Sequence, residues 1–217
     1  MIFMYKAVIF DLDGTLLDSV DDIVYTLNQT LEQFSVAPVS REQTVSYIGN
    51  GASELVRLAI GLKNEGRLAE ILACYKKAYA ASDSSRTKVF EGEMQALLKM
   101  QAAGVKLAVL TNKPHAVAVK SIKQFFGGLN FDCVQGQQEG MPLKPAPQGL
   151  LKILEDMGVS KRECLFVGDG EADVAVAQNA GVDCASVLWG YRTREQLEKI
   201  GAKIFVSSFG ELLKIIL

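Results

Sequence analysis

The stretch of sequence that decides the fold is residues 7–15, Ala-Val-Ile-Phe-Asp-Leu-Asp-Gly-Thr, near the start of the 217-residue chain. A short apolar run that ends at turn-forming residues is typical of a strand buried on both faces of a parallel sheet. Because side chains alternate along a strand, Asp11 and Asp13 leave it on the same side. Two carboxylates this close together are costly unless a cation lies between them or one keeps a proton. Taken alone, the segment predicts a chemically useful charged loop, with a plain solvated loop as the alternative.

Polar residues also follow two later apolar runs, 105–110 and 164–167, and one lysine stands in a loop before a helical pattern. The loops after the carboxyl ends of parallel strands lie along one edge of the sheet, where ligands bind. We therefore expect four carboxylates, one hydroxyl and one ammonium to converge there. These residues are Asp11, Asp13, Thr111, Lys144, Asp169 and Asp173.

The two parts of the chain differ in their hydrophobic pattern. Residues 19–82 show helical patterns and no convincing strand, and Ser40 with Gln43 resembles a capping box that opens one helix. From residue 89 onward strands alternate with helices, which is typical of βαβ units. The expected strands are 106–110, 131–134, 164–167, 184–187 and 204–206, and the expected helices are 94–103, 114–126, 148–157, 171–180, 193–200 and 209–217.

This pattern predicts an α/β fold with a doubly wound parallel sheet as a Rossmann-like core, and an inserted α-helical cap domain. The core is expected to comprise residues 1–18 and 83–217, and the cap residues 19–82, directly after the first strand. The expected hinges are 14–19 and 82–89. A cap tethered beside the carboxylates can act as a lid that excludes water from them, although a mere extra packing layer is the alternative.

The order of these motifs resembles the haloacid dehalogenase-like superfamily: an Asp-x-Asp-Gly-Thr loop, a Thr or Ser, a Lys, and a Gly-Asp-x-x-x-Asp loop. The resemblance covers essentially the whole chain. It implies that Asp11 is a nucleophile that forms an aspartyl-phosphate, which water then hydrolyses. It implies that Asp13 protonates the departing alkoxide and later activates the water. It also implies that Thr111 and Asn112 hydrogen-bond the phosphoryl group, which Lys144 neutralises.

The same resemblance implies Mg²⁺ as the cofactor. Asp11, the backbone carbonyl of Asp13, and Asp169 would hold the ion, and Asp173 would orient its bound waters. Mg²⁺ prefers oxygen ligands in near-octahedral geometry, which carboxylates and waters supply. Gly14 would let backbone amides approach the phosphoryl oxygens and so contribute to substrate binding.

Within the superfamily the chain resembles the phosphoglycolate phosphatases in residues 11–19, 48–52 and 111–113. It departs from them at Gly170-Glu171, where relatives commonly place Ser or Thr before a basic or polar residue, and at residues 90–92, which lack the usual proline. The expected function is therefore Mg²⁺-dependent hydrolysis of a small phosphate monoester, with a phosphoglycolate-like substrate. The alternatives are a sugar phosphomutase of the same superfamily and, from another class, a phospho-receiver signalling module.

The cap contributes one candidate substrate-binding residue, Asn50, which stands between two glycines. Flanking glycines allow close backbone approach to a ligand, and the amide offers both a donor and an acceptor. A plain turn between helices fits the same composition. The single histidine, His115, is expected to begin a helix, and Tyr75 and Tyr79 are expected to pack inside the cap.

Composition narrows the partners and the location. The formal net charge is −2 and the basic residues are scattered, so no nucleic-acid partner is expected, and the partner should be a small phosphorylated metabolite. No apolar run approaches the roughly 20 residues of a membrane span. The first six residues lack the pattern of a secretory signal, and the four cysteines have no Cys-x-x-Cys spacing. We expect a cytoplasmic protein with no membrane partner, of unspecified oligomeric state.

Overall fold

The computed structural model describes residues 5–217. Residues 1–4, which belong to the predicted core segment 1–18 and to the stretch inspected for a secretory signal, lie outside the described residues. A six-stranded parallel sheet in the order β5-β4-β1-β6-β7-β8 forms the core. Its strands are β1 (Ala7–Phe10), β4 (Lys106–Pro114), β5 (Cys133–Gln137), β6 (Cys164–Gly168), β7 (Asp183–Val187) and β8 (Ile204–Val206).

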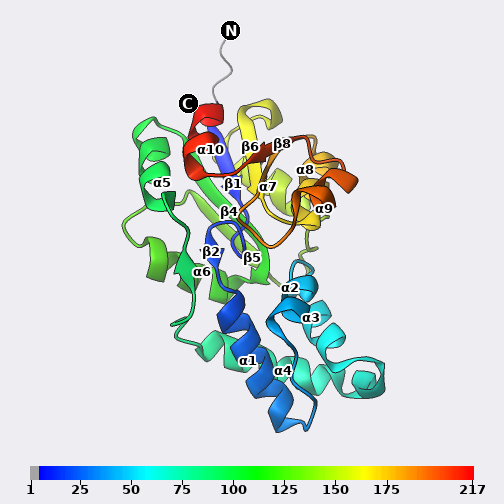
Figure 1. The fold of residues 1–217 in the computed structure, drawn as a ribbon. Coiled ribbons are helices and arrows are strands. Elements are labelled where there is room, and N and C mark those ends of the chain that lie inside the picture. Colours follow the sequence, from blue (N-terminus) through cyan, green and yellow to red (C-terminus); the bar gives the residue numbers. More distant parts are fainter. Residues whose placement is uncertain (1–4) are drawn as a thin grey trace.

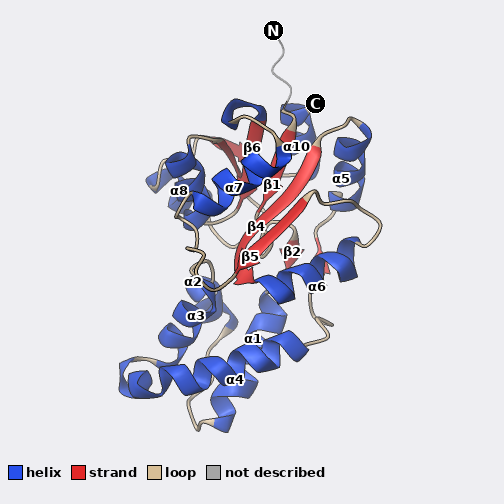
Figure 2. Cartoon of the chain, turned by 180° about the vertical axis from the view of Figure 1, so that it is seen from behind, coloured by secondary structure: helices blue, strands red, loops and turns tan. Residues whose placement is uncertain are grey.

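Helices cover both faces of this sheet (Figures 1 and 2). Val8 and Phe10 of β1 face one apolar layer, together with α5 (Glu93–Ala102), α6 (His115–Phe126) and α10 (Phe209–Ile216). Ala7 and Ile9 face the other layer, with α7 (Gln148–Met157) and α8 (Glu171–Ala180). All four side chains of β1 are fully buried, and burial of a large apolar side chain stabilises a fold by about 1.5–3 kcal/mol. The predicted doubly wound α/β core is therefore confirmed.

Four helices follow β1 and lie together beyond the carboxyl ends of the strands (Figure 1). They are α1 (Val20–Gln33), α2 (Arg41–Tyr47), α3 (Gly51–Ile60) and α4 (Leu68–Ala81), with a 3₁₀ turn at Leu62–Arg67. We call α1–α4 the cap helices. They have an apolar core of their own, in which Leu27, Val56 and Tyr75 are almost completely buried. The capping box predicted at Ser40 and Gln43 is present at the start of α2.

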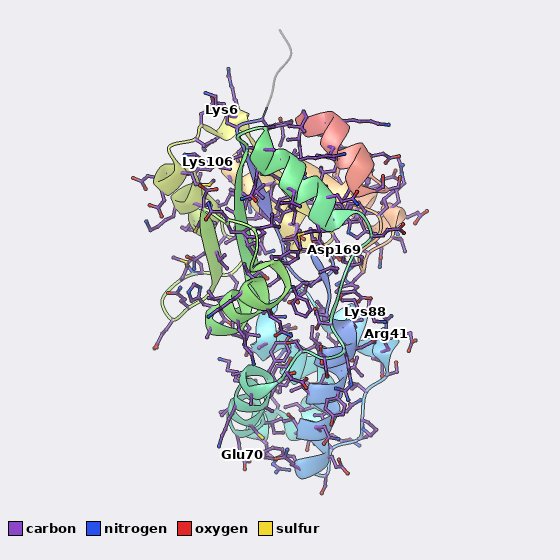
Figure 3. The ribbon with its side chains drawn as sticks, turned by 90° about the vertical axis from the view of Figure 1, so that its left-hand side faces the viewer. Lys6, Arg41, Glu70, Lys88, Lys106 and Asp169 are labelled. Atoms are coloured by element: carbon purple, nitrogen blue, oxygen red, sulfur yellow. The ribbon has the colours of Figure 1, made fainter. Side chains whose placement is uncertain are left out.

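The two segments that connect the cap helices to the core pair with each other. Leu17–Asp18 (β2) and Lys88–Val89 (β3) form a two-stranded antiparallel sheet that sequence analysis missed. The guanidinium of Arg41 also lies 3.9 Å from the Asp18 carboxylate. Figure 3 shows Lys88 and Arg41 at the level where the cap helices meet the core. The residue limits predicted for core and cap stay a prediction.

The observed strand bounds differ most from the predicted ones in β4 and β5. β4 continues through the polar residues 111–113 to Pro114, past a register shift after Leu110, whereas the sequence predicted an end at residue 110. The strand expected at 131–134 is displaced to 133–137, because its pairing with β4 begins at Cys133, opposite Ala108. Tertiary pairing with neighbouring strands thus overrides the local pattern. The remaining helix α9 (Arg194–Lys199) and a 3₁₀ turn at Lys161–Glu163 complete the described chain.

Candidate active site

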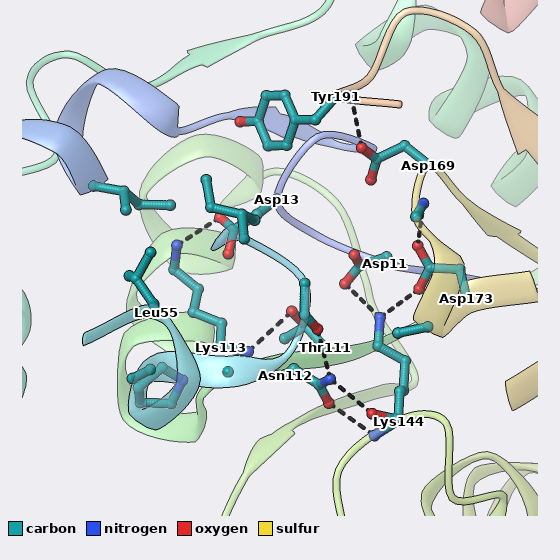
Figure 4. Close-up of a pocket in the computed structure, with 18 of the residues that line it drawn as sticks. Asp11, Asp13, Leu55, Thr111, Asn112, Lys113, Lys144, Asp169, Asp173 and Tyr191 are labelled. Atoms are coloured by element: carbon teal, nitrogen blue, oxygen red, sulfur yellow. Dashed lines mark hydrogen bonds and ion pairs between the residues drawn. The ribbon is translucent and has the colours of Figure 1, made fainter. Parts of the chain in front are cut away.

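Three carboxylates meet where β1 and β6 end. Asp11 follows β1, and Asp169 and Asp173 follow β6, so the central pair of strands brings them together. Each of the three offers an oxygen atom, and these atoms lie within 4.8 Å of one another. Asp169 and Asp173 are buried, and all three line one pocket (Figure 4). The cluster is therefore a concentrated, poorly solvated negative charge.

Lys144 supplies positive charge to this cluster. Its ammonium lies 2.8 Å from Oδ1 of Asp11 and 2.6 Å from Oδ1 of Asp173, with 2% of the lysine side chain exposed. The other oxygen of Asp173 accepts a hydrogen bond of 2.9 Å from the backbone N–H of Gly170. Burial opposes the charge of the ammonium, but Asp11 and Asp173 outweigh it and raise the pKa of Lys144. Lys144 is thus held as a cation between two acids.

One ammonium does not offset all the negative charge. Burial raises the pKa of Asp11 to about 6, with a further rise from Asp173 that Lys144 partly opposes. Burial, followed by the charges of Asp173 and Asp11, raises the pKa of Asp169 to about 8. Oδ1 of Asp11 is buried at ion-pair distance from Lys144 but has no aligned hydrogen bond within residues 5–217. An oxygen-preferring divalent cation fits this arrangement, because it would relieve the repulsion among the three carboxylates.

The loop after β1 is shaped around Asp169. Oδ1 of Asp169 accepts a hydrogen bond of 3.2 Å from Thr15, and Oδ2 accepts one of 2.7 Å from the backbone N–H of Tyr191. Gly14 has φ +85°, and a Cβ atom there would collide with the Asp169 carboxylate. The N–H of Gly14 donates to the carbonyl of Leu17. The structure therefore brings Gly14 against Asp169, while its amide is engaged within the loop.

Asp13 lies apart from the three clustered carboxylates. Its Oδ1 accepts hydrogen bonds from Oγ of Ser19 at 2.5 Å and from Nζ of Lys113 at 2.7 Å. Lys113 also donates to the hydroxyl of Tyr79 in α4, at 2.5 Å. Lys113 is not among the site residues predicted from the sequence, although alternation along a strand places it on the same side as Thr111 and so points to it. Asp13 thus faces the cap helices, and a lysine accompanies it there.

Thr111 and Asn112 reach the pocket from the end of β4, and both are buried. The hydroxyl of Thr111 accepts a bond of 3.2 Å from the backbone N–H of Lys113. The side-chain amide of Asn112 donates to the carbonyls of Gly49 at 2.8 Å and Lys144 at 3.0 Å, and its oxygen accepts from the N–H of Lys144 at 2.9 Å. Asn112 therefore ties the Lys144 loop to the cap helices, and both of its amide hydrogens are already used.

The cap loop between α2 and α3 is held from a second side by Arg192. Its guanidinium donates to the carbonyls of Val45 at 2.9 Å and Ile48 at 2.8 Å, and binds both oxygens of Glu171 at 2.8 and 3.0 Å. Glu171 is one of the residues at which the sequence departs from the phosphoglycolate phosphatases that it resembles. In the structure this residue pairs with Arg192. Asn50 itself is exposed and does not line the pocket, whereas Gly49 and Gly51 do. The predicted substrate contact of Asn50 stays a prediction.

The pocket between core and cap has two unlike walls. The core wall carries the carboxylates, Lys144 and Thr111, and the cap wall is mostly apolar. The space is about 660 Å³, part of it open to solvent. Residues from the cap helices that line it include Ile23, Ala52, Leu55, Tyr75 and Tyr79. A charged group held by the core wall would thus be covered by apolar surface.

Comparison with known proteins agrees with this geometry. The sequence model of the family described as haloacid dehalogenase-like hydrolase matches residues 8–187. The chain is 33% identical over 214 residues to phosphoglycolate phosphatase 1 of Pseudomonas aeruginosa, which covers 96% of this chain and 78% of that protein. It is 32% identical over 221 residues to the phosphoglycolate phosphatase of Psychrobacter arcticus, with 98% and 96% covered. A solved structure from Lactobacillus delbrueckii subsp. bulgaricus matches with a TM-score of 0.89 and 29% identity, covering 99% of both chains.

The chain belongs to the haloacid dehalogenase-like hydrolase family. The predicted membership in this family is therefore confirmed, as is the prediction of a phosphatase enzyme. Of the predicted site residues of this hydrolase, seven line the pocket: Asp11, Asp13, Thr111, Asn112, Lys144, Asp169 and Asp173. Gly14 and Asn50 do not line it. The roles assigned to all nine residues stay predictions.

Two further expectations concern residues outside the motifs. His115 begins α6, as predicted, and its Nδ1 accepts a hydrogen bond of 3.3 Å from the N–H of Gly136. Tyr75 and Tyr79 stack inside the cap with ring centroids 5.5 Å apart, yet both also line the pocket. Across the described residues, no helix combines the length and the apolar character needed to cross a membrane.

Proposed function

We propose that this hydrolase cleaves a small phosphate monoester through an aspartyl-phosphate on Asp11, with Mg²⁺ as cofactor. The observation that carries the proposal is the meeting of Asp11, Asp169 and Asp173 with a single buried ammonium at the ends of β1 and β6. A phosphoryl dianion needs positive charge around it, and a carboxylate is a competent nucleophile toward phosphorus. The relatives named phosphoglycolate phosphatase favour a phosphoglycolate-like substrate.

In the first proposed step an oxygen of Asp11 attacks phosphorus, and the bond from phosphorus to the ester oxygen breaks. Asp13 gives its proton to the departing alkoxide, which leaves as an alcohol. In the second step Asp13 takes a proton from water, whose oxygen attacks phosphorus, so that inorganic phosphate leaves and Asp11 is restored. The position of Asp13 on the cap side, away from the three clustered acids, supports its role beside the leaving group.

The remaining residues position the reactants. Lys144 lies against the Asp11 carboxylate and would neutralise the phosphoryl group, and the Thr111 hydroxyl would donate to it. Asn112 fixes the backbone of Lys144 and is assigned a positioning role, because its amide is engaged by the protein. Asp11, Asp169 and the carbonyl of Asp13 would hold Mg²⁺, with Asp173 in support. When bound, the ion supplies positive charge that stabilises the phosphoryl oxygens.

The proposal is tested by assaying release of inorganic phosphate from a panel of short phosphate monoesters, including 2-phosphoglycolate, with and without Mg²⁺. A phosphatase releases phosphate stoichiometrically with the alcohol. A sugar phosphomutase would instead isomerise a sugar phosphate without release, so the same samples distinguish the alternative. Absence of phosphate release from the whole panel at saturating Mg²⁺ would contradict the proposal. We also propose the cytoplasm as the location, where small phosphorylated metabolites are available.

A further inference from the structure

Lys113 is a buried cation that the proposed mechanism does not use. It stands near the end of β4, and 3% of its side chain is exposed. Its ammonium bridges Oδ1 of Asp13, 2.7 Å away in the core, and the hydroxyl of Tyr79, 2.5 Å away in the cap. Figure 4 shows the ammonium on the Asp13 side of the pocket, next to Leu55 and away from the cluster around Lys144. A charge this deeply buried needs a functional or structural reason.

Lys113 and Tyr79 retain hydrogen-bond donors. An ammonium has three N–H groups, and the side chain of Lys113 has two partners within residues 5–217. The Tyr79 hydroxyl accepts from Lys113, and its own hydrogen has no acceptor among the described residues. Burial, followed by the charges of Asp13 and Asp22, raises the pKa of Tyr79 well above its usual value, so the hydroxyl keeps that hydrogen. Two adjacent donors in one pocket are suited to a carboxylate.

The other cations that line the pocket are committed elsewhere. Lys144 is held by Asp11 and Asp173, on the phosphoryl side. Arg192 directs its guanidinium to Glu171 and to two cap carbonyls. Apart from the hydroxyls of Tyr75 and Tyr79, the side chains of the cap helices that line the pocket are apolar, and none of them carries a positive charge. Lys113 is therefore the lining cation best placed to bind an anionic group on the leaving alcohol.

The position of Lys113 matches the leaving group rather than the phosphoryl group. Asp13 would donate to the ester oxygen at a hydrogen-bond distance of about 2.7 Å, and the same carboxylate contacts Lys113. The ammonium thus lies within about two hydrogen-bond lengths plus the width of one carboxylate of the ester oxygen, or roughly 7 to 8 Å. In a phosphorylated 2-hydroxy acid a single carbon separates the ester oxygen from the carboxyl carbon, so its carboxylate falls in this range. The apolar side chain of Leu55, in α3, also lines the pocket on this side.

We propose that Lys113 and Tyr79 together bind the carboxylate of a short phosphorylated hydroxy acid. They would select this substrate over phosphate monoesters whose alcohol part carries no charge. This inference rests on the proposed function and adds the two residues that determine substrate specificity. Lys113 would exchange part of its interaction with Asp13 for the substrate carboxylate. The Tyr79 hydroxyl would donate the second hydrogen bond, from the cap.

The test compares two substrates of nearly the same shape: 2-phosphoglycolate and the phosphate ester of glycolamide, in which an uncharged amide replaces the carboxylate. We expect the wild-type kcat/KM to favour 2-phosphoglycolate. Replacing Lys113 by Met should lower this ratio by about 10- to 100-fold, the scale of one charged hydrogen bond. Any effect of the substitution on Asp13 applies to both substrates and cancels in the ratio.

Two further variants keep the test decisive. Tyr79→Phe removes one donor and retains the ring stack, so we expect a smaller fall of the ratio in the same direction, even if Lys113→Met fails to fold. Lys113→Arg keeps the charge and should retain part of the preference. The matched control is Lys123→Met, an exposed lysine of α6, which should leave the ratio unchanged.

The outcomes separate this inference from the proposed function. Equal losses on both substrates in Lys113→Met and Tyr79→Phe would mean that these residues only position Asp13 and the cap, and would overturn the inference. A wild-type enzyme that hydrolyses other monoesters but does not prefer the carboxylate would overturn it as well, while the proposed function would stand. If the wild type hydrolyses no monoester, the proposed function fails, and this inference fails with it.

Discussion

The two halves of the pocket are built on different principles. The core half collects Asp11, Asp169, Asp173 and Lys144 at the ends of strands in one rigid sheet. The cap half depends on contacts between the core and the cap helices: Lys113 binds Tyr79, and Arg192 binds the end of α2 and the loop before α3. It therefore forms only when the two separate apolar cores are in contact. In the proposed function, the core half performs the chemistry on the phosphoryl group, and the cap half selects the ester.

The largest expected effect lies in the core half. Asp11→Asn should lower kcat by about 10⁴-fold or more, because an amide does not form the acyl-phosphate and nucleophile losses are of this order. Phosphate release measures the loss, and the melting temperature checks that the fold is retained. Asp156→Asn, an exposed aspartate paired with Lys152, is the matched control. Substantial turnover by a sequence-verified Asp11→Asn protein would remove Asp11 from the nucleophile role.

Removal of divalent metal should also act on the core half for every substrate. Exhaustive chelation is expected to stop hydrolysis, and added Mg²⁺ to restore it, because within residues 5–217 the three clustered acids have a single buried ammonium, that of Lys144, against them. Asp169→Asn should raise the Mg²⁺ concentration needed for half-maximal activity. Activity that survives chelation unchanged would contradict the metal site.

Arg192→Ala tests the cap half. Loss of two hydrogen bonds, one to the end of α2 and one to the loop before α3, should lower kcat/KM by about 10- to 100-fold, on the scale of one to two charged hydrogen bonds. Amide hydrogen exchange in residues 45–51 should become faster in the same variant. Arg194→Ala, two residues away and paired with exposed Glu198, is the control. Unchanged exchange in that loop would show that Arg192 does not fasten the cap.

Glu93 lies outside both halves of the pocket and serves as a reference for an effect on stability alone. It is fully buried at the start of α5, one of its carboxylate oxygens has no partner within residues 5–217, and burial raises its pKa from 4.5 to about 9. Because the pKa of Glu93 is higher in the folded state, the stabilising contribution of this side chain is complete below about pH 4.5 and is lost as the pH rises toward 9. Glu93→Gln should therefore raise the free energy of unfolding by about 1–3 kcal/mol near pH 8, and much less near pH 5.

Urea unfolding at the two pH values measures this difference. Since Glu93 does not line the pocket, the Glu93→Gln substitution should not change the ratio of activities on 2-phosphoglycolate and on the phosphate ester of glycolamide. An equal stability change at both pH values would show that Glu93 does not titrate as described.

Much of the core half could be predicted because its signals are local. The buried strand before Asp11, the strand before Asp169, and helices 148–157 and 171–180 lie where the hydrophobic pattern placed them. Parallel strand ends share one edge, so the meeting of their loops follows from topology alone. Predictions failed where neighbouring strands set the register, as in the extension of β4 to Pro114, and where two short connectors paired as β2 and β3.

The sequence by itself determined the α/β alternation, the helical insertion and the acids and lysine of the core half, because periodicity and strand-end position are properties of short segments. Only the tertiary structure decided that Lys113 contacts Asp13 and Tyr79, that Arg192 holds the cap loop, and that Asn50 is exposed and does not line the pocket. These contacts join residues 34 to 147 positions apart in the chain. No local pattern encodes such pairs, since they depend on how the packed cap helices are placed over the sheet.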